Sequence, residues 1–258
     1  MRRAFRGLTG WRGRARAAAA GGPLPGFREV VFLSHVNDPA VTPPFPGDPE
    51  FRITPVRSVA ADGFALNEVR QGEHTGSHYD APCHFNEGEA SADLLDAADF
   101  VRQAAVVDVR RQAAASADYE ISVDDLRRHE RRHGKIPAGA AVLGLTGWSA
   151  RWGTPAYANA DAAGALHQPG FGVDAARWLL DERGAGVLGT DTFSPEASAD
   201  TGFRVSSMLL RGNRIALSNL AALDRMPPAG GWIVVGGPRN AAGTGAPCTV
   251  FGLIPARP

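Results

Sequence analysis

The stretch GEHTGSHYDAPCHF, residues 72–85, concentrates side chains that can bind a metal ion. It holds three of the chain's seven histidines, His74, His78 and His84, together with Asp80. All four positions are even-numbered, so an extended backbone would project them to one side, with the glycine between them leaving room for an ion. A helix fits less well, because Asp80 would lie well round it and the glycine and proline would weaken it. The spacing therefore predicts that these side chains meet at one point.

Two imidazoles and one carboxylate suit a borderline-soft divalent ion and leave one of its coordination positions open. An open position is typical of catalytic rather than structural metal sites. His84 could be a further ligand, or it could carry a proton near the metal-bound water. The alternative is that these are surface or capping histidines. That interpretation would be favoured for a lone histidine, but it is not favoured for a cluster.

The composition is that of an ordinary globular protein of 258 residues, long enough for one large domain or two small ones. Lys+Arg and Asp+Glu both number 27, so no global charge favours nucleic acid or an anionic membrane. Cys83 and Cys248 do not make a disulfide framework and fit a reducing cytoplasm. No apolar run approaches the roughly 20 residues that span a bilayer. We therefore expect a soluble, cytoplasmic protein.

The first residues differ from the rest, because arginine, glycine and alanine dominate them and acidic residues are absent up to position 22. The segment lacks the apolar core of a secretory signal. We expect residues 1–25 to form a disordered basic extension and residues 26–258 to form the folded domain.

Strands and helices alternate after residue 25. Residues 37–49 hold five prolines and predict an irregular loop. A helix is predicted after Ser122, an N-cap residue, with its end at Gly134. The pattern predicts a single α/β domain with a mixed sheet. A second helix is expected at 174–183, and strands are expected at 28–34, 105–109, 141–145, 186–189, 215–217, 232–235 and 249–254.

The stretch HTGSHYDAPCHF resembles the His-x-Gly-Thr-His-x-Asp-x-Pro-x-His-Phe motif of the cyclase-like metal-dependent hydrolases. That family includes bacterial kynurenine formamidases and isatin hydrolases. Ser77 replaces the threonine of the motif and keeps its hydroxyl. The similarity extends over most of residues 28–256, for example in GVLGTDTFSPE at 186–196. The resemblance implies the swivelling β/β/α cyclase-like fold and a homodimer or homotetramer.

The resemblance also implies roles for the clustered residues. His74, His78 and Asp80 would bind a divalent metal, zinc or manganese, and His84 would act as general acid and base. The implied reaction is attack of metal-bound hydroxide on the carbonyl of a small amide, lactone or formamide. This agrees with the physical chemistry, since a bound ion acidifies water and imidazole titrates near neutral pH.

One departure from the family concerns a second metal. Members with two metals carry a histidine and, twelve residues later, a glutamate, in a pattern that aligns with residues 206–220. Ser206 and Ser218 stand at those two positions. Because neutral hydroxyls are poor ligands for zinc or manganese, the sequence predicts a mononuclear centre, with the serines lining the pocket or holding a water.

Four further residues are candidates for supporting roles. Asp191 follows a buried strand, where it could orient a histidine or cap loop amides. His167 could replace a missing ligand, although a structural or substrate-contacting role is favoured. Phe85 and Trp148 could wall a pocket for a planar substrate, or belong to the core.

The sequence therefore predicts a metal-dependent hydrolase of a small aromatic or cyclic amide, lactone or formamide. The first alternative is a natural-product cyclase of the polyketide type, using the same metal and His84 for ring closure. A second is a catalytically inactive homologue that binds small molecules. An iron(II) oxygenase shares the ligand set but not the other motifs.

Overall fold

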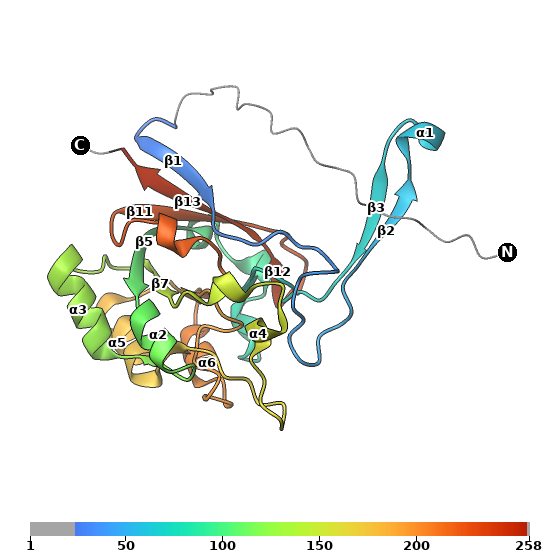
Figure 1. Ribbon diagram of the computed structural model, residues 1–258. Helices are drawn as coiled ribbons and strands as arrows, with labels where there is room; N and C mark the ends of the chain where they lie inside the picture. The colour runs from blue at the N-terminus through green and yellow to red at the C-terminus, as the bar shows by residue number, and fades with distance from the viewer. Residues whose placement is uncertain (1–23, 257–258) are drawn as a thin grey trace.

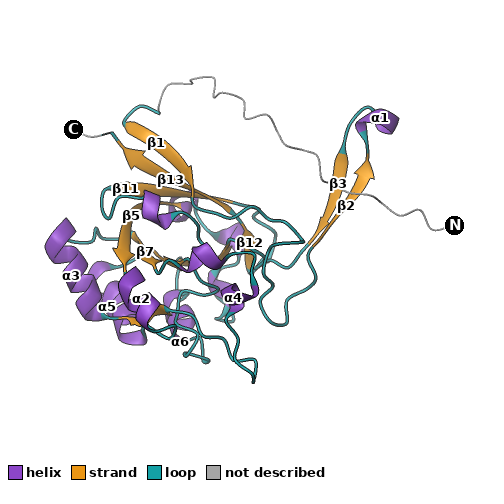
Figure 2. Ribbon diagram, viewed as in Figure 1, coloured by secondary structure: helices purple, strands orange, loops and turns teal. Residues whose placement is uncertain are grey.

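The computed structural model describes residues 24–256, and its main element is a nine-stranded mixed sheet in the order β1-β13-β11-β5-β7-β9-β10-β4-β12 (Figures 1 and 2). The four strands β5, β7, β9 and β10 are parallel, and the strands on either side pair antiparallel. The predicted α/β fold with a mixed sheet is confirmed. The strands are β1 (Phe27–Phe32), β4 (His78–Asp80), β5 (Val101–Asp108), β7 (Ala141–Leu145), β9 (Val187–Thr190), β10 (Ile215–Ser218), β11 (Gly231–Gly236), β12 (Gly245–Pro247) and β13 (Thr249–Pro255).

Helices cover the outer face of the parallel strands. Leu126 of α3 and Leu179 of α5 pack against Val107, Val142 and Leu188 of the sheet. Figure 1 shows α2, α3, α5 and α6 gathered on this side. The helices are α1 (Val59–Asp62), α2 (Arg110–Ala115), α3 (Val123–His133), α4 (Pro155–Ala158), α5 (Val173–Arg183) and α6 (Arg204–Leu209).

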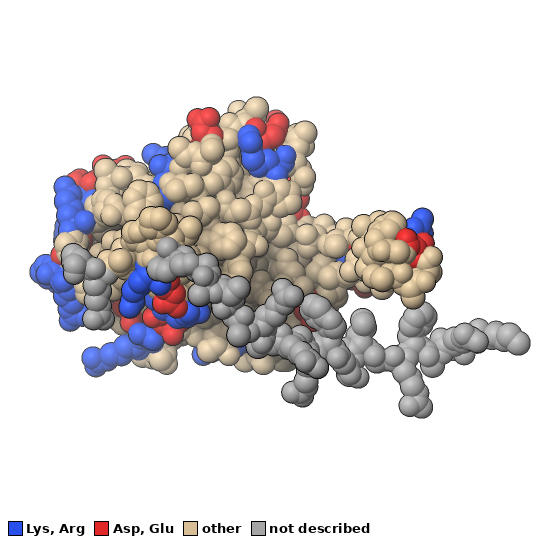
Figure 3. All heavy atoms as spheres, turned by 90° about the horizontal axis from the view of Figure 1, so that it is seen from above, with Lys and Arg blue, Asp and Glu red and all other residues tan. Residues whose placement is uncertain are grey.

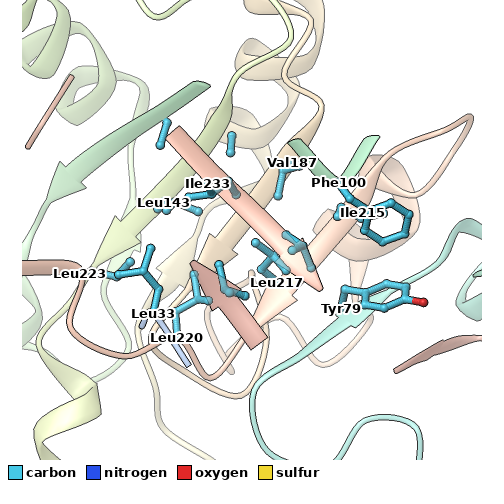
Figure 4. Close-up of a cluster of buried hydrophobic side chains, with 14 of the residues drawn as sticks. Leu33, Tyr79, Phe100, Leu143, Val187, Ile215, Leu217, Leu220, Leu223 and Ile233 are labelled. Carbon is cyan, nitrogen blue, oxygen red and sulfur yellow. The ribbon is translucent and has the colours of Figure 1, made fainter. Parts of the chain in front are cut away.

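The inner face of the sheet closes around a second apolar cluster, drawn in Figure 4. Strand alternation produces the two layers: in β5, Val106 points into this inner cluster and Val107 points out to the helices. Leu143, Leu217 and Ile233 meet in the inner cluster from three different strands. The sheet is therefore buried on both faces where its strands are parallel, which explains their near-continuous apolar runs.

Local signals account for the predicted helices. Ser122 accepts a hydrogen bond from the backbone N–H of Asp125, whose side chain accepts from the Ser122 N–H in return. This capping box starts α3, and Gly134 follows its last residue. At the end of α5, Gly184 adopts a left-handed φ of 56°. Both helices begin and end within a residue of the prediction.

A two-stranded arm was not predicted. It consists of β2 (Arg52–Arg57) and β3 (Leu66–Arg70), which pair antiparallel and are joined through α1. Figure 1 shows the arm extending away from the nine-stranded sheet. A second small sheet pairs β6 (Glu120–Ile121) with β8 (Gly170–Phe171) in parallel.

Three further predictions concern the N-terminal extension, membrane spans and the two cysteines. The predicted basic extension, residues 1–25, lies outside the described residues except for Leu24 and Pro25. Within residues 24–256, no helix combines the length and apolarity that a membrane span requires. Cys83 and Cys248 are both free thiols. The reducing compartment inferred from them stays a prediction.

Candidate metal centre

The backbone of the histidine motif is extended over only part of its length, so the prediction of a continuous extended stretch is wrong. Only His78–Asp80 forms a strand, β4; His74 lies in a turn, and a 3-10 helix, η1, spans Pro82–His84. Gly76 has a φ of +66° and packs so closely on Asn37 that an added Cβ would lie 2.1 Å from the amide oxygen. The glycine therefore makes the turn and admits Asn37, rather than leaving space for an ion.

The predicted ligands nevertheless converge. One ligand atom each from His74, His78 and Asp80 lies within 4.8 Å of the other two. The Asp80 Oδ1 atom is 2.8 Å from His74 Nδ1 and 3.4 Å from His78 Nε2. Ligands at about 2.1 Å from one ion stand roughly 3.0–3.4 Å apart, so the three side chains fit a single divalent ion with little movement.

Hydrogen bonds on the far side of each imidazole fix which nitrogen faces Asp80. His78 Nδ1 lies 2.8 Å from the Gly76 carbonyl oxygen, to which it donates, and this leaves Nε2 as the ligand atom. His74 Nε2 lies 3.0 Å from the Thr244 hydroxyl, which itself donates to Glu73 over 2.7 Å. His74 therefore presents Nδ1, and both rings have the supporting partner that metal-binding histidines usually have.

The charges of the cluster suit a cation. Burial by itself would raise the pKa of Asp80, but the hydrogen bond with His74 and the nearby imidazoles lower it to about 2. Burial lowers the pKa of His78 to about 4. At neutral pH Asp80 is thus ionised and His78 neutral, the forms in which both bind a metal. Burial also acts to lower the pKa of His74, but its hydrogen bond with Asp80 and the surrounding carboxylates raise it.

His84 lies against the cluster without belonging to it. Its ring stacks on that of His74 with centroids 3.8 Å apart and makes a T-shaped contact with Phe85. Burial lowers the pKa of His84, partly opposed by the charge of Asp80. The imidazole is therefore neutral at pH 7 and able to accept a proton.

A cavity of about 370 Å³ opens beside these residues. His74, His78, Asp80 and His84 all line it, so the candidate ligands and the candidate base share one space. Four phenylalanines supply its apolar wall. These are Phe45, Phe85, Phe193 and Phe203.

Comparison with known proteins agrees with this geometry. Residues 31–197 match the model of the Cyclase family, described as "Putative cyclase". The chain belongs to the cyclase family. It is 32% identical over 249 residues to the isatin hydrolase of Roseibium aggregatum, covering 90% of this chain and 94% of that protein. The prediction of a cyclase-family enzyme is confirmed.

Two solved structures extend the comparison. An isatin hydrolase bound to the product analogue thioisatinate superimposes with a TM-score of 0.82 at 30% identity, covering 88% of this chain and 93% of that one. A potential metal-dependent hydrolase with cyclase activity gives a TM-score of 0.67 at 21% identity, covering 89% of this chain and 99% of that one. The cyclase-like fold is thereby confirmed.

The serines at the second-metal positions of the family are buried, one in α6 and the other in β10. Ser206, in α6, donates from its backbone N–H and its hydroxyl to Glu196 at 2.8–3.0 Å. Ser218, in β10, lies directly opposite His78 in the pairing with β4. Neither serine is among the residues that line the cavity. Within residues 24–256, the His74, His78 and Asp80 group is the one cluster of three or more potential ligands.

Three further candidates lie away from the cavity. Asp191 accepts hydrogen bonds from the backbone N–H and the hydroxyl of Thr146 at 2.9 and 2.6 Å, so it caps loop amides, the alternative role considered for it. His167 pairs with Asp118 at 2.9 Å on the surface, where it cannot replace a ligand. Trp148 is core, with its indole N–H donating to a backbone carbonyl. Phe85 does line the cavity, as predicted.

Several residues of the site were assigned no role from the sequence. Asn219 lines the cavity, donates to the Gly76 carbonyl over 2.7 Å and accepts from the Tyr157 hydroxyl. Its backbone has a left-handed φ of 55°, a conformation that asparagine adopts more readily than most residues. Thr244 and Glu196 reach the site from distant segments that resemble the family, but no role for either residue followed from the sequence.

Proposed function

We propose that this cyclase-family protein hydrolyses the C–N bond of a small cyclic amide fused to or carried by an aromatic ring, such as isatin. One zinc or manganese ion would be held by His74, His78 and Asp80. The observation that carries the proposal is that these three ligands and His84 face one cavity with an aromatic wall. The isatin hydrolases among its relatives support the choice of substrate class.

The ion would lower the pKa of a water molecule and polarise the substrate carbonyl. The protein's own task is to hold the donors in their binding forms. Asp80 stays ionised because its pKa is about 2. The hydrogen bonds from His74 to Thr244 and from His78 to the Gly76 carbonyl keep each ring in one tautomer and orientation.

His84 is the proposed general base and acid. Its lowered pKa leaves the ring neutral at pH 7, so it can take a proton from water and return it to the leaving nitrogen. Stacking against His74 places it beside the ligands at a ring separation of 3.8 Å. Because the ring stacks on His74 and makes a T-shaped contact with Phe85, its orientation is restricted.

The phenylalanines select for a flat, apolar substrate. Phe45 and Phe193 meet edge to face at 5.6 Å, and Phe85 and Phe203 lie 5.3 Å apart on the wall that adjoins His84. Aromatic side chains bind planar rings through offset-stacked or edge contacts. They also exclude water, which strengthens the electrostatic interactions of the site.

We also propose that the centre is mononuclear. Ser206 is fully used in hydrogen bonds to Glu196, and both serines are neutral. Burial raises the pKa of Glu196 to about 7, partly opposed by hydrogen bonds from Ser194 and Ser206, so this carboxyl holds a proton for much of the neutral range. A cluster of hydroxyls and a half-protonated carboxyl is a weak partner for a second divalent ion.

The test is whether protein loaded with zinc or manganese opens the ring of isatin. The change in ultraviolet absorbance measures the rate of this reaction. His84→Gln should lower kcat/KM by about 10²–10⁴-fold with its metal content unchanged, because a positioned acid–base group contributes that much. His167→Gln, a histidine on the surface, is the matched control and should match wild type. Wild-type activity in His84→Gln would refute the role of that residue. If the protein instead binds isatin, or lactones of similar shape, tightly but hydrolyses none of them, the result would favour the inactive binding homologue.

A further inference from the structure

Positive charge is concentrated on one side of a molecule whose total charge is balanced. Lys+Arg and Asp+Glu both number 27 over the chain. Helix α2 nevertheless begins with two arginines, and α3 carries four more among its eleven residues. Figure 3 shows blue Lys and Arg atoms gathered at the left edge, the side on which Figure 1 places α3. The excess is therefore local, and it comes from where the arginines are placed rather than from how many there are.

Four of these arginines line a hollow beside α2 and α3, which we call the arginine hollow. Its volume is about 820 Å³, and it shares no lining residue with the cavity of the candidate metal centre. One carboxylate, that of Asp108 at the end of β5, lies among the arginines. The four arginines are Arg110, Arg111, Arg128 and Arg132. The hollow is thus a second candidate binding site, charged where the cavity of the metal centre has an aromatic wall.

Two of the four guanidinium groups are held in place by carboxylates. Arg110 donates to Asp108 from Nε and Nη2, over 3.0 and 2.6 Å. Arg128 donates to Asp125 over 3.0 Å, and Asp125 is itself buried and accepts from the Tyr119 hydroxyl. Because a guanidinium has five N–H donors, each of the two groups keeps donors that can face a ligand. These two arginines are therefore positioned before any ligand arrives.

The other two guanidinium groups have no carboxylate of their own. Among residues 24–256, neither Arg111 nor Arg132 takes part in an ion pair, and both are exposed. Arg132 lies four residues after Arg128 on α3, and like charges at this spacing repel each other along a helix. Even with both neighbouring carboxylates counted, four guanidinium groups face two negative charges. The hollow therefore keeps an excess of positive charge that a bound anion would neutralise.

We propose that the arginine hollow binds a small polyanion, a chain of two or three phosphates. The inference does not depend on the proposed reaction, because the hollow and the metal centre have no residue in common. Arginine is suited to this ligand, since its planar fork donates two parallel hydrogen bonds to a phosphate. A single phosphate would meet only part of a hollow of this size, whereas linked phosphates extend along it and bring charge to arginines of both helices.

Two observations favour a phosphate chain over a nucleic acid. Among the described residues that line the hollow, none is aromatic, so a base has no ring on which to stack. The positive surface is also interrupted beyond the hollow, where Arg127 pairs with Asp124 at 3.9 Å and Glu130 pairs with Arg183 at 2.7 Å. A strand of nucleic acid is bound along a continuous basic groove. The hollow therefore suits a compact ligand that is recognised by charge alone.

The experiment is isothermal titration calorimetry of the full-length, metal-loaded protein with sodium triphosphate. Wild type should bind a single triphosphate per chain, and the affinity should fall as salt is added. Arg111→Gln with Arg132→Gln should lower the affinity by at least about 10-fold, the factor that corresponds to the loss of one hydrogen bond to a charged group. Arg28→Gln with Arg211→Gln is the matched control, because it removes the same charge from exposed positions outside the hollow. This control pair should keep the wild-type affinity.

The source of the phosphates is tested with adenosine triphosphate. It should bind about as tightly as triphosphate, because the hollow offers the nucleoside no aromatic contact. Binding of adenosine triphosphate without binding of triphosphate would contradict recognition through the phosphates.

Other results would also overturn the proposal. They are a lack of triphosphate binding at low salt, equal affinity in the two arginine pairs, binding that disappears when the metal is removed, and tighter binding of duplex DNA that the Arg111 and Arg132 pair abolishes. The loss of binding with the metal would place the anion on the metal ion. Circular dichroism identifies any variant that fails to fold.

A second measurement on wild type needs no variant. Phenylglyoxal modifies accessible guanidinium groups, and mass spectrometry of the peptides locates the modified arginines. Triphosphate should protect Arg111 and Arg132 but not Arg211, which lies outside the hollow. Equal modification with and without triphosphate would contradict the site.

Discussion

A buried carboxylate between imidazoles sets the chemistry of this site at the scale of single residues. Asp80 keeps its charge in a desolvated position because His74 and His78 lie against it. The same arrangement places one atom each of His74, His78 and Asp80 where a single cation could bind all three. The cation would take the place of the hydrogen bond between His74 and Asp80. Each of the two histidines also has a hydrogen-bonding partner on the far side of its ring: the Gly76 carbonyl for His78 and, for His74, the Thr244 hydroxyl.

Removal of that partner should weaken metal binding. Thr244→Val keeps the shape of the side chain but leaves His74 Nε2 without its acceptor at 3.0 Å. Loss of such a supporting hydrogen bond typically lowers metal affinity by about 10–100-fold. Competition with a fluorescent chelator measures the affinity, and Thr201→Val, an exposed threonine, is the control. Unchanged affinity in Thr244→Val would contradict the assigned tautomer of His74.

Glu196 should make stability depend on pH. Its pKa is 4.5 in a model peptide and about 7 in the fold, where it is 2% exposed. Below pH 4.5 the carboxyl is protonated in both the folded and the unfolded chain. Between pH 4.5 and 7 the unfolded chain releases the proton while the folded chain keeps it, so the free energy of unfolding falls as the pH rises. Relative to Glu196→Gln, whose side chain does not titrate, the free energy of unfolding of wild type should fall by roughly 2 kcal/mol between pH 5 and pH 8.

Urea unfolding at the two pH values measures this difference. Asp161→Asn provides the comparison, because Asp161 lies on the surface and its pKa is lowered by loop N–H groups rather than raised. A gap between wild type and Glu196→Gln that does not change with pH would show that the carboxyl is ionised throughout.

At the scale of elements, the short strand β4 carries two of the three candidate ligands, His78 and Asp80, and depends on its neighbours for its position. It is three residues long and pairs on one side with β10 and on the other with β12. Leu217 of β10 lies opposite Tyr79 of β4, and both are fully buried in the inner cluster. The geometry of His78 and Asp80 therefore depends on packing beneath them.

Leu217→Ala should lower the free energy of unfolding by about 2–5 kcal/mol, because it deletes buried methyl groups and leaves a cavity. Urea unfolding of metal-free protein measures it, and Leu94→Ala at an exposed site should change the value by less than about 0.5 kcal/mol. A small effect at Leu217 would indicate that the inner cluster relaxes into the space.

The sequence predicts the elements whose signals are local. Helix α3 follows from its cap at Ser122 and its stop at Gly134, and the buried strands follow from their apolar runs. The backbone of the motif could not be predicted, because its turn is made by Gly76 against Asn37 and held by Asn219, residues that folding brings from elsewhere.

The arm could not be predicted for a different reason. A proline and a bulge near Pro55 interrupt its alternation, and its apolar side chains find no core within the chain. The convergence of His74, His78 and Asp80 was predictable, because the motif gathers four metal-capable side chains within eleven positions. Trp148 and His167 show the limit of such reasoning, since residue type alone does not distinguish a cavity wall from core or surface.

At the scale of the whole molecule, the fold brings four distant segments to one cavity. The loop before the arm supplies Phe45, β4 and its flanks supply the candidate ligands, and Phe193 and Phe203 come from the segments after β9. The curled sheet holds these segments in place through cores on both faces. The proposed function therefore requires that these converging residues hold a single metal ion.

The most direct test of that claim is metal content per chain, measured by elemental analysis of protein purified without added metal. We expect about one zinc or manganese ion per wild-type chain, its loss in His78→Ala, which removes a buried ligand, and its retention in His167→Ala, which alters a surface histidine. Two ions per wild-type chain, or none even after reconstitution with either metal, would contradict the mononuclear centre.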